Sequence, residues 1–193
     1  FSYADRRVLT DISFVVPAGD RVGLIGENGS GKSTLLRAVA GVLEPDTGAV
    51  TINAPHDGKP TIGLLHQEPP FSATETIEQS LQTAVAKPRR AGSEVDALAV
   101  ALANNPNDPA IADAYAGALE KAERLGAWEI DARISAVLTG LGLGYIDRER
   151  LTGSLSGGQR ARLALAWLLL NKPDVLLLDE PTNHLDDAAT SFL

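Results

Sequence analysis

The stretch GENGSGKS at residues 26–33 decides the fold that we expect for this chain. It matches the pattern of a glycine, any four residues and then Gly-Lys-Ser, which is typical of a loop that binds phosphate. Its glycines allow backbone conformations that most side chains forbid, so successive N–H groups can converge on phosphate oxygens. Lys32 is placed to reach the β- and γ-phosphates, and the Ser33 hydroxyl is placed to bind Mg²⁺. The stretch therefore predicts a site for a nucleoside triphosphate.

The residues on either side of this loop predict a strand before it and a helix after it. Residues 21–25 (RVGLI) form a short apolar run that we expect to be a buried strand, and residues 34–40 read as the first turns of a helix. A strand, the loop and a helix, in that order, are the context that the motif requires. The alternative is a glycine-rich turn that binds nothing, but every fixed position of the motif is filled.

Composition sets limits on the class of protein. The 193 residues include 17 Lys and Arg against 25 Asp and Glu, which gives a net charge of −8 and disfavours broad binding of nucleic acid. Cysteine is absent, and the longest apolar run, residues 163–170, is far too short to span a bilayer. We therefore expect a cytoplasmic protein without direct membrane insertion. Because the chain lacks methionine, begins inside an expected strand and ends inside an expected helix, we also expect it to be a fragment of a longer protein.

The pattern of apolar residues predicts strands near the N-terminus and helices in the middle of the chain. Strands are expected within residues 1–16 and at residues 49–52 and 61–65. Helices are expected at residues 74–86, 93–103, 109–125 and 129–141, with breaks at residues 88–92, at residues 104–108 and at Gly126. The basic cluster KPRR at residues 87–90 fits a solvated loop. This alanine- and leucine-rich stretch predicts a helical subdomain inserted into an α/β core.

A second anion site is predicted at LSGGQ, residues 155–159. Ser156 can cap the apolar helix expected at residues 160–170, and the two glycines leave its N-terminal amides bare. Such amides, at the positive end of the helix dipole, attract anions.

Acidic residues follow the apolar run VLLL at residues 175–178, which is suited to a buried parallel strand. Asp179 at its end predicts a second anchor for Mg²⁺, and Glu180 can polarise an attacking water molecule. Gln67 follows the strand expected at residues 61–65 and could touch Mg²⁺ and the same water, although a glutamine in a loop means little by itself. Tyr3 precedes the phosphate loop at a distance suited to stacking on adenine, but a half-buried strand tyrosine would fit that position equally well.

GENGSGKS, Gln67, LSGGQ and VLLLDE, in that order and spacing, resemble the ATP-binding cassette (ABC) ATPases. The resemblance covers essentially the whole chain, and LSGGQ upstream of an acidic strand end is its most specific part. It implies an α/β fold: a P-loop NTPase core with a parallel sheet, an N-terminal antiparallel β subdomain and an inserted α-helical subdomain. The implied divisions are a core at residues 1–71, a helical subdomain at residues 72–154, and a third part at residues 155–193. This third part contains the helix that begins with LSGGQ, here named the signature helix, and a truncated return to the core.

A closer resemblance is to the ABC-F group. It rests on EPTNHLD at residues 180–186, with support from RLGAWE at 124–129, GLGL at 140–143 and RARLAL at 160–165. That group consists of soluble proteins with two cassettes in one chain, many of which act on ribosomes. The resemblance implies a first cassette, a second cassette as its partner in a head-to-tail nucleotide sandwich, and contact with the ribosome through regions outside this chain.

The resemblance also assigns roles to residues, with ATP and Mg²⁺ as the cofactors. The phosphate loop is implied to bind nucleotide through Gly26, Glu27, Asn28, Gly29, Ser30, Gly31, Lys32, Ser33 and Thr34, and Tyr3 to stack on adenine. The implied metal ligands are Ser33, Gln67 and Asp179, and the catalytic residues are Glu180 and Gln67. Ser156, Gly157, Gly158 and Gln159 are implied to complete the site of the opposite cassette.

One departure and two alternatives accompany this interpretation. ABC ATPases carry a histidine beyond the acidic strand, whereas neither His56 nor His66 matches it, so we expect weak or absent turnover from this chain alone. The ATPase subunit of a membrane transporter shares every catalytic motif, and EPTNHLD and the middle helices argue against it. A binding switch, in which ATP occupancy matters more than hydrolysis, is the other alternative.

Overall fold

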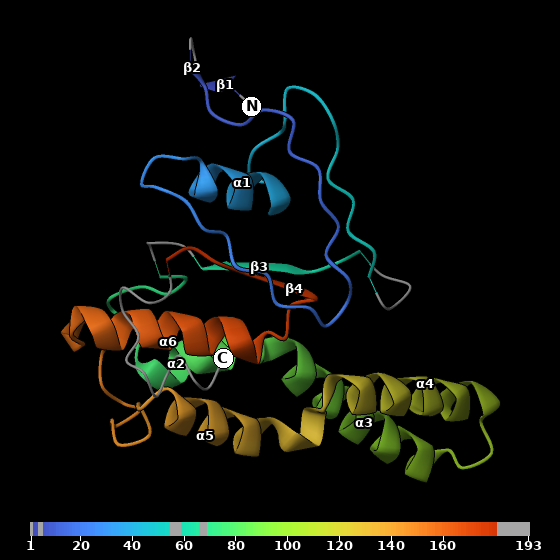
Figure 1. Ribbon diagram of the computed structural model, residues 1–193. Helices are drawn as coiled ribbons and strands as arrows, with labels where there is room; N and C mark the ends of the chain where they lie inside the picture. Colours follow the sequence, from blue (N-terminus) through green and yellow to red (C-terminus); the bar gives the residue numbers. More distant parts are fainter. Residues whose placement is uncertain (1, 4–5, 55–58, 66–68, 181–193) are drawn as a thin grey trace. The chain divides into compact units, whose positions relative to one another are not determined.

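A computed structural model of the protein describes residues 2–3, 6–54, 59–65 and 69–180 (Figure 1). The chain divides into two compact units. The first unit comprises Phe1–Gln67 and Pro173–Pro181, and the second comprises Glu68–Lys172 and Thr182–Leu193. Parallel strands lie in the first unit and a group of helices forms the second, which is the α/β class expected from the sequence.

The first unit contains one helix and two pairs of strands among its described residues. They are β1 Ser2–Tyr3, β2 Arg6–Arg7, α1 Lys32–Val39, β3 Ile62–Leu65 and β4 Val175–Leu178. β1 and β2 are antiparallel, whereas β3 and β4, which are far apart in the sequence, pair in parallel (Figure 1). The parallel pair confirms the strands expected at residues 61–65 and 175–178.

A polar clamp fixes the register of β3 and β4 at their start. The Thr61 amide and hydroxyl each donate to Oδ2 of Asp174 at 2.7 Å, and the Asp174 amide donates to the Thr61 hydroxyl at 3.1 Å. In the resulting register Leu65 lies opposite Leu178, so the two strands end level with one another. The carboxyl ends of both strands, at Leu65 and Leu178, therefore lie at the same edge of the sheet.

Other strands expected from the sequence are absent from the described residues. Residues 8–16, 21–25 and 49–52 form no strand, and several of their apolar side chains are exposed, with Ile25 at 100% and Val22 at 59%. The prediction of a buried strand before the phosphate loop is therefore wrong for this structure. β-branched residues favour an extended backbone, but a strand also needs a neighbour that pairs with its amides and carbonyls. Within the described part of the chain, these segments have no such ladder.

The second unit consists of helices joined by short connections. They are α2 Ile77–Ala84, α3 Ala86–Asn104, α4 Pro109–Leu125, η1 Ala127–Glu129, α5 Ile130–Gly140, η2 Thr152–Ser154 and α6 Gly157–Leu170. The helical subdomain is thus present, and the break expected at Gly126 is confirmed. Asp108 caps α4 with Pro109 in the first turn, and Gly126 ends the helix in a left-handed conformation with φ of 64°.

The expected break at residues 88–92 is wrong, because α3 runs through it. Pro88 lies in the first turn of α3, where its missing N–H costs no helical hydrogen bond. Arg89 and Arg90 are therefore helical residues and not part of a solvated loop, and Ser93 lies inside the helix instead of capping it. Gly92 sits close to Ala127, since a Cβ on it would lie 3.6 Å from the Ala127 Cβ.

Apolar side chains hold the helical unit together in two places. α3 packs along α4 around a small-residue core formed by Ala91, Val95, Ala118 and Ala122 (Figure 1). α6 packs against both α2 and α5, and its Leu163 and Leu165 are fully buried. Within the described residues, none of the helices is both long enough and apolar enough to cross a membrane.

Candidate functional site

The phosphate loop is held by its own backbone and by Lys32. The Ser30 amide donates to the Glu27 carbonyl at 3.1 Å, which closes the turn that contains Asn28 and Gly29. The Lys32 ammonium donates to the carbonyls of Gly26 at 2.7 Å and Glu27 at 2.9 Å. Lys32 thus lies across the loop with its charge at the loop itself, as a lysine that meets phosphate requires.

The three loop glycines show two different features, a positive φ and a close neighbour. Gly29 and Gly31 have φ of 81° and 95°, in the left-handed region that favours glycine. A Cβ on Gly31 would also lie 2.7 Å from the Leu9 Cδ2 and 3.0 Å from a Val8 methyl. Gly26 does not need a positive φ, but a Cβ there would lie 2.8 Å from the Ser30 hydroxyl. The backbone freedom expected of all three glycines is confirmed at Gly29 and Gly31 but is wrong at Gly26, which has no positive φ.

Helix α1 begins directly after Gly31 and carries Lys32, Ser33 and Thr34 in its first turn. The first amides of a helix have no partner within it, and the dipole adds positive charge at that end. No acidic side chain lies in this first turn. The loop and the helix end together therefore suit a polyphosphate, as the sequence predicts.

The carboxylates expected to serve the metal and the water follow β4. Asp179 is half-buried at the end of the strand, and the next residue, Glu180, is exposed with φ of 48°. A non-glycine residue in this left-handed region is uncommon and is often found at functional sites. The hydroxyl of Ser33 and the carboxylate of Asp179 are hard oxygen donors of the kind that Mg²⁺ prefers. Gln67, which is expected to share this metal, lies outside the described residues.

Two other predictions rest on residues that the structure describes only in part or not at all. Tyr3 lies in β1, where its backbone pairs with Arg6, and its stacking on adenine stays a prediction. Of EPTNHLD, residues 181–186 lie outside the described residues, as does the rest of the chain to residue 193.

The LSGGQ stretch forms the start of α6, where Ser156 and Gln159 cap the helix. The Ser156 hydroxyl accepts from the Gln159 amide at 3.2 Å, and Oε1 of Gln159 accepts from the Ser156 amide at 3.0 Å. This reciprocal pair is a capping box. The predicted cap at Ser156 is confirmed, and α6 begins at Gly157, three residues earlier than residue 160 expected from the sequence.

The packing of the described chain does not require glycine at residues 157 and 158. A Cβ on either residue would meet nothing within 4 Å, and neither residue has a positive φ. Alanine would therefore fit both positions as far as this chain is concerned. We infer that glycine at these positions serves the close approach of a group from outside the chain.

Backbone hydrogen bonds within the helical unit join the residues before α6 to the residues before α2, and we name this pair of segments, residues 72–75 and 152–153, the backbone ribbon. The segment before α6 bonds to the segment before α2: the Thr152 amide donates to the Glu75 carbonyl at 2.9 Å, and the Gly153 amide to the Ala73 carbonyl at 3.0 Å. The Thr152 side chain is fully buried and its hydroxyl donates to the Ser72 carbonyl at 2.6 Å. Residues that follow Gln67 closely in the sequence are thus joined directly to residues that precede LSGGQ.

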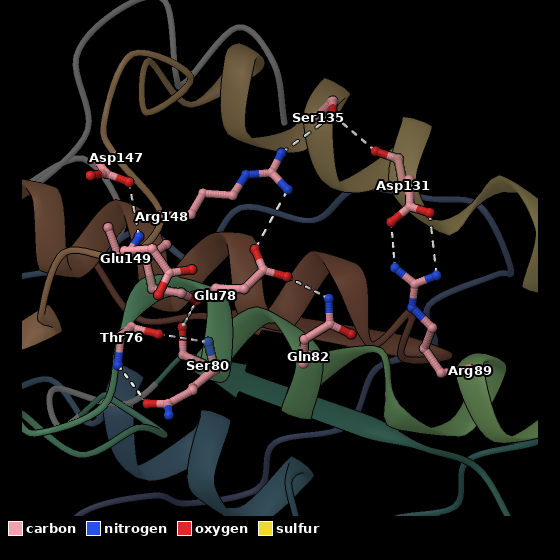
Figure 2. A network of polar contacts seen from close by, with 12 residues as sticks. Thr76, Glu78, Ser80, Gln82, Arg89, Asp131, Ser135, Asp147, Arg148 and Glu149 are labelled. Atoms are coloured by element: carbon pink, nitrogen blue, oxygen red, sulfur yellow. Dashed lines mark hydrogen bonds and ion pairs between the residues drawn. The ribbon is translucent and has the colours of Figure 1, made fainter.

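A network of side chains continues this ribbon across three elements (Figure 2). The Arg148 guanidinium lies between Glu78 of α2, at 3.6 Å, and the Ser135 hydroxyl of α5, at 3.4 Å. Arg89 of α3 forms a two-pronged ion pair with Asp131 of α5. The Arg89 hydrogen bond, more than its charge, holds the pKa of the exposed Asp131 carboxyl below its ordinary value. The network ties the start of α2 and the face of α5 to the loop before the signature.

Sequence reasoning missed Tyr145, which also belongs to this region. Its hydroxyl lies 3.2 Å from Nε2 of Gln159. Tyr145 belongs to no motif and no periodic pattern, and it lies in a turn fourteen positions before Gln159. Only the arrangement of α5 and α6 brings the two side chains together.

Comparison with known proteins identifies the family to which this chain is similar. A family profile described as ABC transporter matches residues 9–183. The tylosin resistance ATP-binding protein TlrC of Streptomyces fradiae is 43% identical over 99% of this chain and 35% of its own length. ABC transporter F family member 5 of Arabidopsis thaliana is 36% identical over 96% of this chain and 27% of its own length. The energy-dependent translational throttle protein EttA of Mycobacterium tuberculosis is 34% identical over the whole chain and 33% of its own length.

Solved structures show the same fold. The ATP-binding subunit of an ABC transporter superposes with a TM-score of 0.67 at 25% identity, over 98% of this chain and 67% of the other. A putative metal-chelate type ABC transporter superposes with a TM-score of 0.58 at 23% identity, over all of this chain and 61% of the other. The chain spans about a third of the length of the curated relatives described above. It belongs to the ABC transporter family and, by these relatives, to the ABC-F group within it.

Proposed function

We propose that this chain is an ATP-hydrolysing cassette, the first of two in a cytoplasmic ABC-F protein that acts on the ribosome in translation or in antibiotic resistance. One observation carries the proposal. The chain offers both a phosphate loop with its lysine in place and a capped helix start with two bare glycines. Two relatives support the process: one is named as a tylosin resistance protein and another as a translational throttle.

In this proposal the residues of the phosphate loop hold the nucleotide. The backbone of residues 26–34 surrounds the phosphates, and Lys32 exchanges its bonds to the Gly26 and Glu27 carbonyls for phosphate oxygens. Tyr3 stacks on adenine. Ser33, Asp179 and Gln67 hold Mg²⁺, which neutralises charge on the phosphates when it is bound. Glu180 orients the attacking water molecule and accepts its proton.

The signature residues act on a different nucleotide. In a head-to-tail pair of cassettes, Ser156, Gly157, Gly158 and Gln159 complete the site of the second cassette. ATP then favours the closed pair, and hydrolysis allows it to open, which is a shift of population driven by ligand. Because each site needs residues from both cassettes, we expect weak or absent turnover from residues 1–193 alone.

Sedimentation with ribosomes tests this function in the full-length protein that contains this chain. The variant carries Glu180→Gln together with the equivalent change in the second cassette, and Glu149→Gln, an exposed glutamate of the helical unit, is the matched control. We expect the Glu180→Gln protein to co-sediment with ribosomes only when ATP is present, because ATP that is not hydrolysed keeps the cassettes closed.

The control should show no such accumulation. ATP-independent sedimentation, or none at all from a protein shown to bind ATP, would contradict the ribosomal role and direct attention to a membrane or other protein partner.

A further inference from the structure

Tyr145 is placed by a rigid turn, not by burial of its ring. Its side chain is 76% exposed, so packing does not explain its position. The turn itself is well held: the Leu143 amide donates to the Leu138 carbonyl at 2.7 Å, and Leu143 is buried. A Cβ on Gly144 would lie 3.1 Å from the Thr139 hydroxyl, so this residue lies tightly against the end of α5. The tyrosine hydroxyl is thereby carried to the start of α6.

The orientation of the Gln159 amide follows from its two partners. The Ser156 amide can only donate, so the atom that faces it at 3.0 Å must be the Gln159 oxygen. The Gln159 NH₂ group then faces Tyr145, at 3.2 Å, and the tyrosine oxygen accepts its proton. Both ends of the amide are therefore engaged, one by the cap and the other by Tyr145.

We propose that Tyr145 is a positioning residue that fixes Gln159 and, through it, the signature face of α6. The proposal rests on the function proposed above, in which this face meets a nucleotide on the second cassette. With Tyr145 in place, Gln159 is held in one orientation beside the bare amides of Gly157 and Gly158. Without the Tyr145 hydroxyl, Oε1 of Gln159 can still cap the helix, but the NH₂ group of Gln159 loses its partner. The Gln159 side chain then gains conformational freedom, which it must lose again when the cassettes close on ATP.

A double-mutant cycle in the full-length protein tests the proposal. Tyr145→Phe removes only the hydroxyl, and we expect kcat for ATP to fall about three- to tenfold, the effect of one hydrogen bond. KM should stay unchanged, because in the proposed function each nucleotide is held mainly by the phosphate loop of its own cassette, and the midpoint of thermal unfolding should stay unchanged because the capping box persists. In a Gln159→Ala background, Tyr145→Phe should cause no further loss. Tyr115→Phe, the same change in the α3–α4 core, is the matched control and should leave kcat unchanged.

Equal loss of kcat in both backgrounds would overturn the proposal, because Tyr145 would then act independently of Gln159. Loss of thermal stability in step with kcat would overturn it too, since the role would be structural.

A second readout needs no turnover and separates this proposal from the proposed function. In nucleotide-free protein labelled with ¹⁵N-glutamine, the Gln159 side-chain amide signal is assigned by its absence in Gln159→Ala. Tyr145→Phe should shift that signal and leave the Gln79 and Gln82 amides in place. An unshifted Gln159 signal would overturn the positioning role, whereas a shifted signal in a protein that hydrolyses no ATP would contradict the proposed function alone.

Discussion

Two glycines of the helical unit differ in how much space a side chain would have at their position. Gly153 belongs to the backbone ribbon behind the signature, where a Cβ would lie 2.6 Å from the Ala73 carbonyl oxygen and 3.1 Å from the Ala73 Cβ. Because the nearest atom is backbone, it cannot rotate away. Gly158 has nothing within 4 Å of the same position and lies in the first turn of a helix. The fold requires the first glycine but not the second, which is consistent with the role toward a ligand proposed for Gly158.

Substitution by alanine at these two positions should separate stability from activity. Gly158→Ala should leave the free energy of unfolding unchanged or raise it by up to about 1 kcal/mol, because alanine favours the helix. It should nevertheless lower ATP turnover of the full-length protein at least about tenfold, because the methyl group covers an amide that meets phosphate. Gly153→Ala should instead lower the free energy of unfolding by about 1–3 kcal/mol. Denaturant titration and turnover assays measure both effects, and normal turnover in Gly158→Ala would refute the role of its bare amide.

Elements were predictable where a local signal decides them. The cap at Ser156 and the break at Gly126 could be predicted because each depends on its immediate neighbours. The continuity of α3 through Pro88 could not be predicted. A proline is tolerated there only because the helix has already begun at Ala86, which places Pro88 in the first turn. The prediction of a strand at residues 21–25 is wrong for a related reason. Its apolar pattern is local, but strand formation depends on partners elsewhere in the chain.

The ion pair between α3 and α5 predicts a dependence of stability on pH. Arg89 lowers the pKa of Asp131 from its ordinary value of 3.8, so the pair stabilises the fold above that pH and loses its effect as pH falls through the lower, folded value. Asp131→Asn should therefore lower the midpoint of thermal unfolding slightly at pH 7, and the difference from wild type should vanish in acid, once the pH has fallen through the lowered pKa of Asp131. High salt should reduce it, because the carboxyl is exposed.

Asp96→Asn makes the same charge change on the exposed face of α3 and is the matched control. A difference between Asp131→Asn and wild type that persisted unchanged in acid would show that the ion pair is not its cause.

At the scale of the whole molecule, the sequence predicted local features of the chain better than the contacts that hold them in place. Its motifs located the loop before α1, the cap at Ser156 and the acidic end of β4, because each is a short run of neighbouring residues. It could not identify Tyr145 or the ribbon from Thr152 to Ser72, because these contacts join residues far apart in the sequence and use no characteristic pattern. The predicted division at residues 71–72 and 154–155 stays a prediction.

The measurement that tests the central claim most directly is ATP binding and turnover by the full-length protein, with and without Glu180→Gln in this cassette and its counterpart. We expect the variant to bind ATP as tightly as wild type, because Lys32 and the loop are unchanged. We expect its ATP turnover to fall at least about a hundredfold, because the attacking water loses its base. Turnover at the wild-type rate would contradict the role of Glu180, and loss of ATP binding together with turnover would contradict the separation of the phosphate loop from the catalytic strand end.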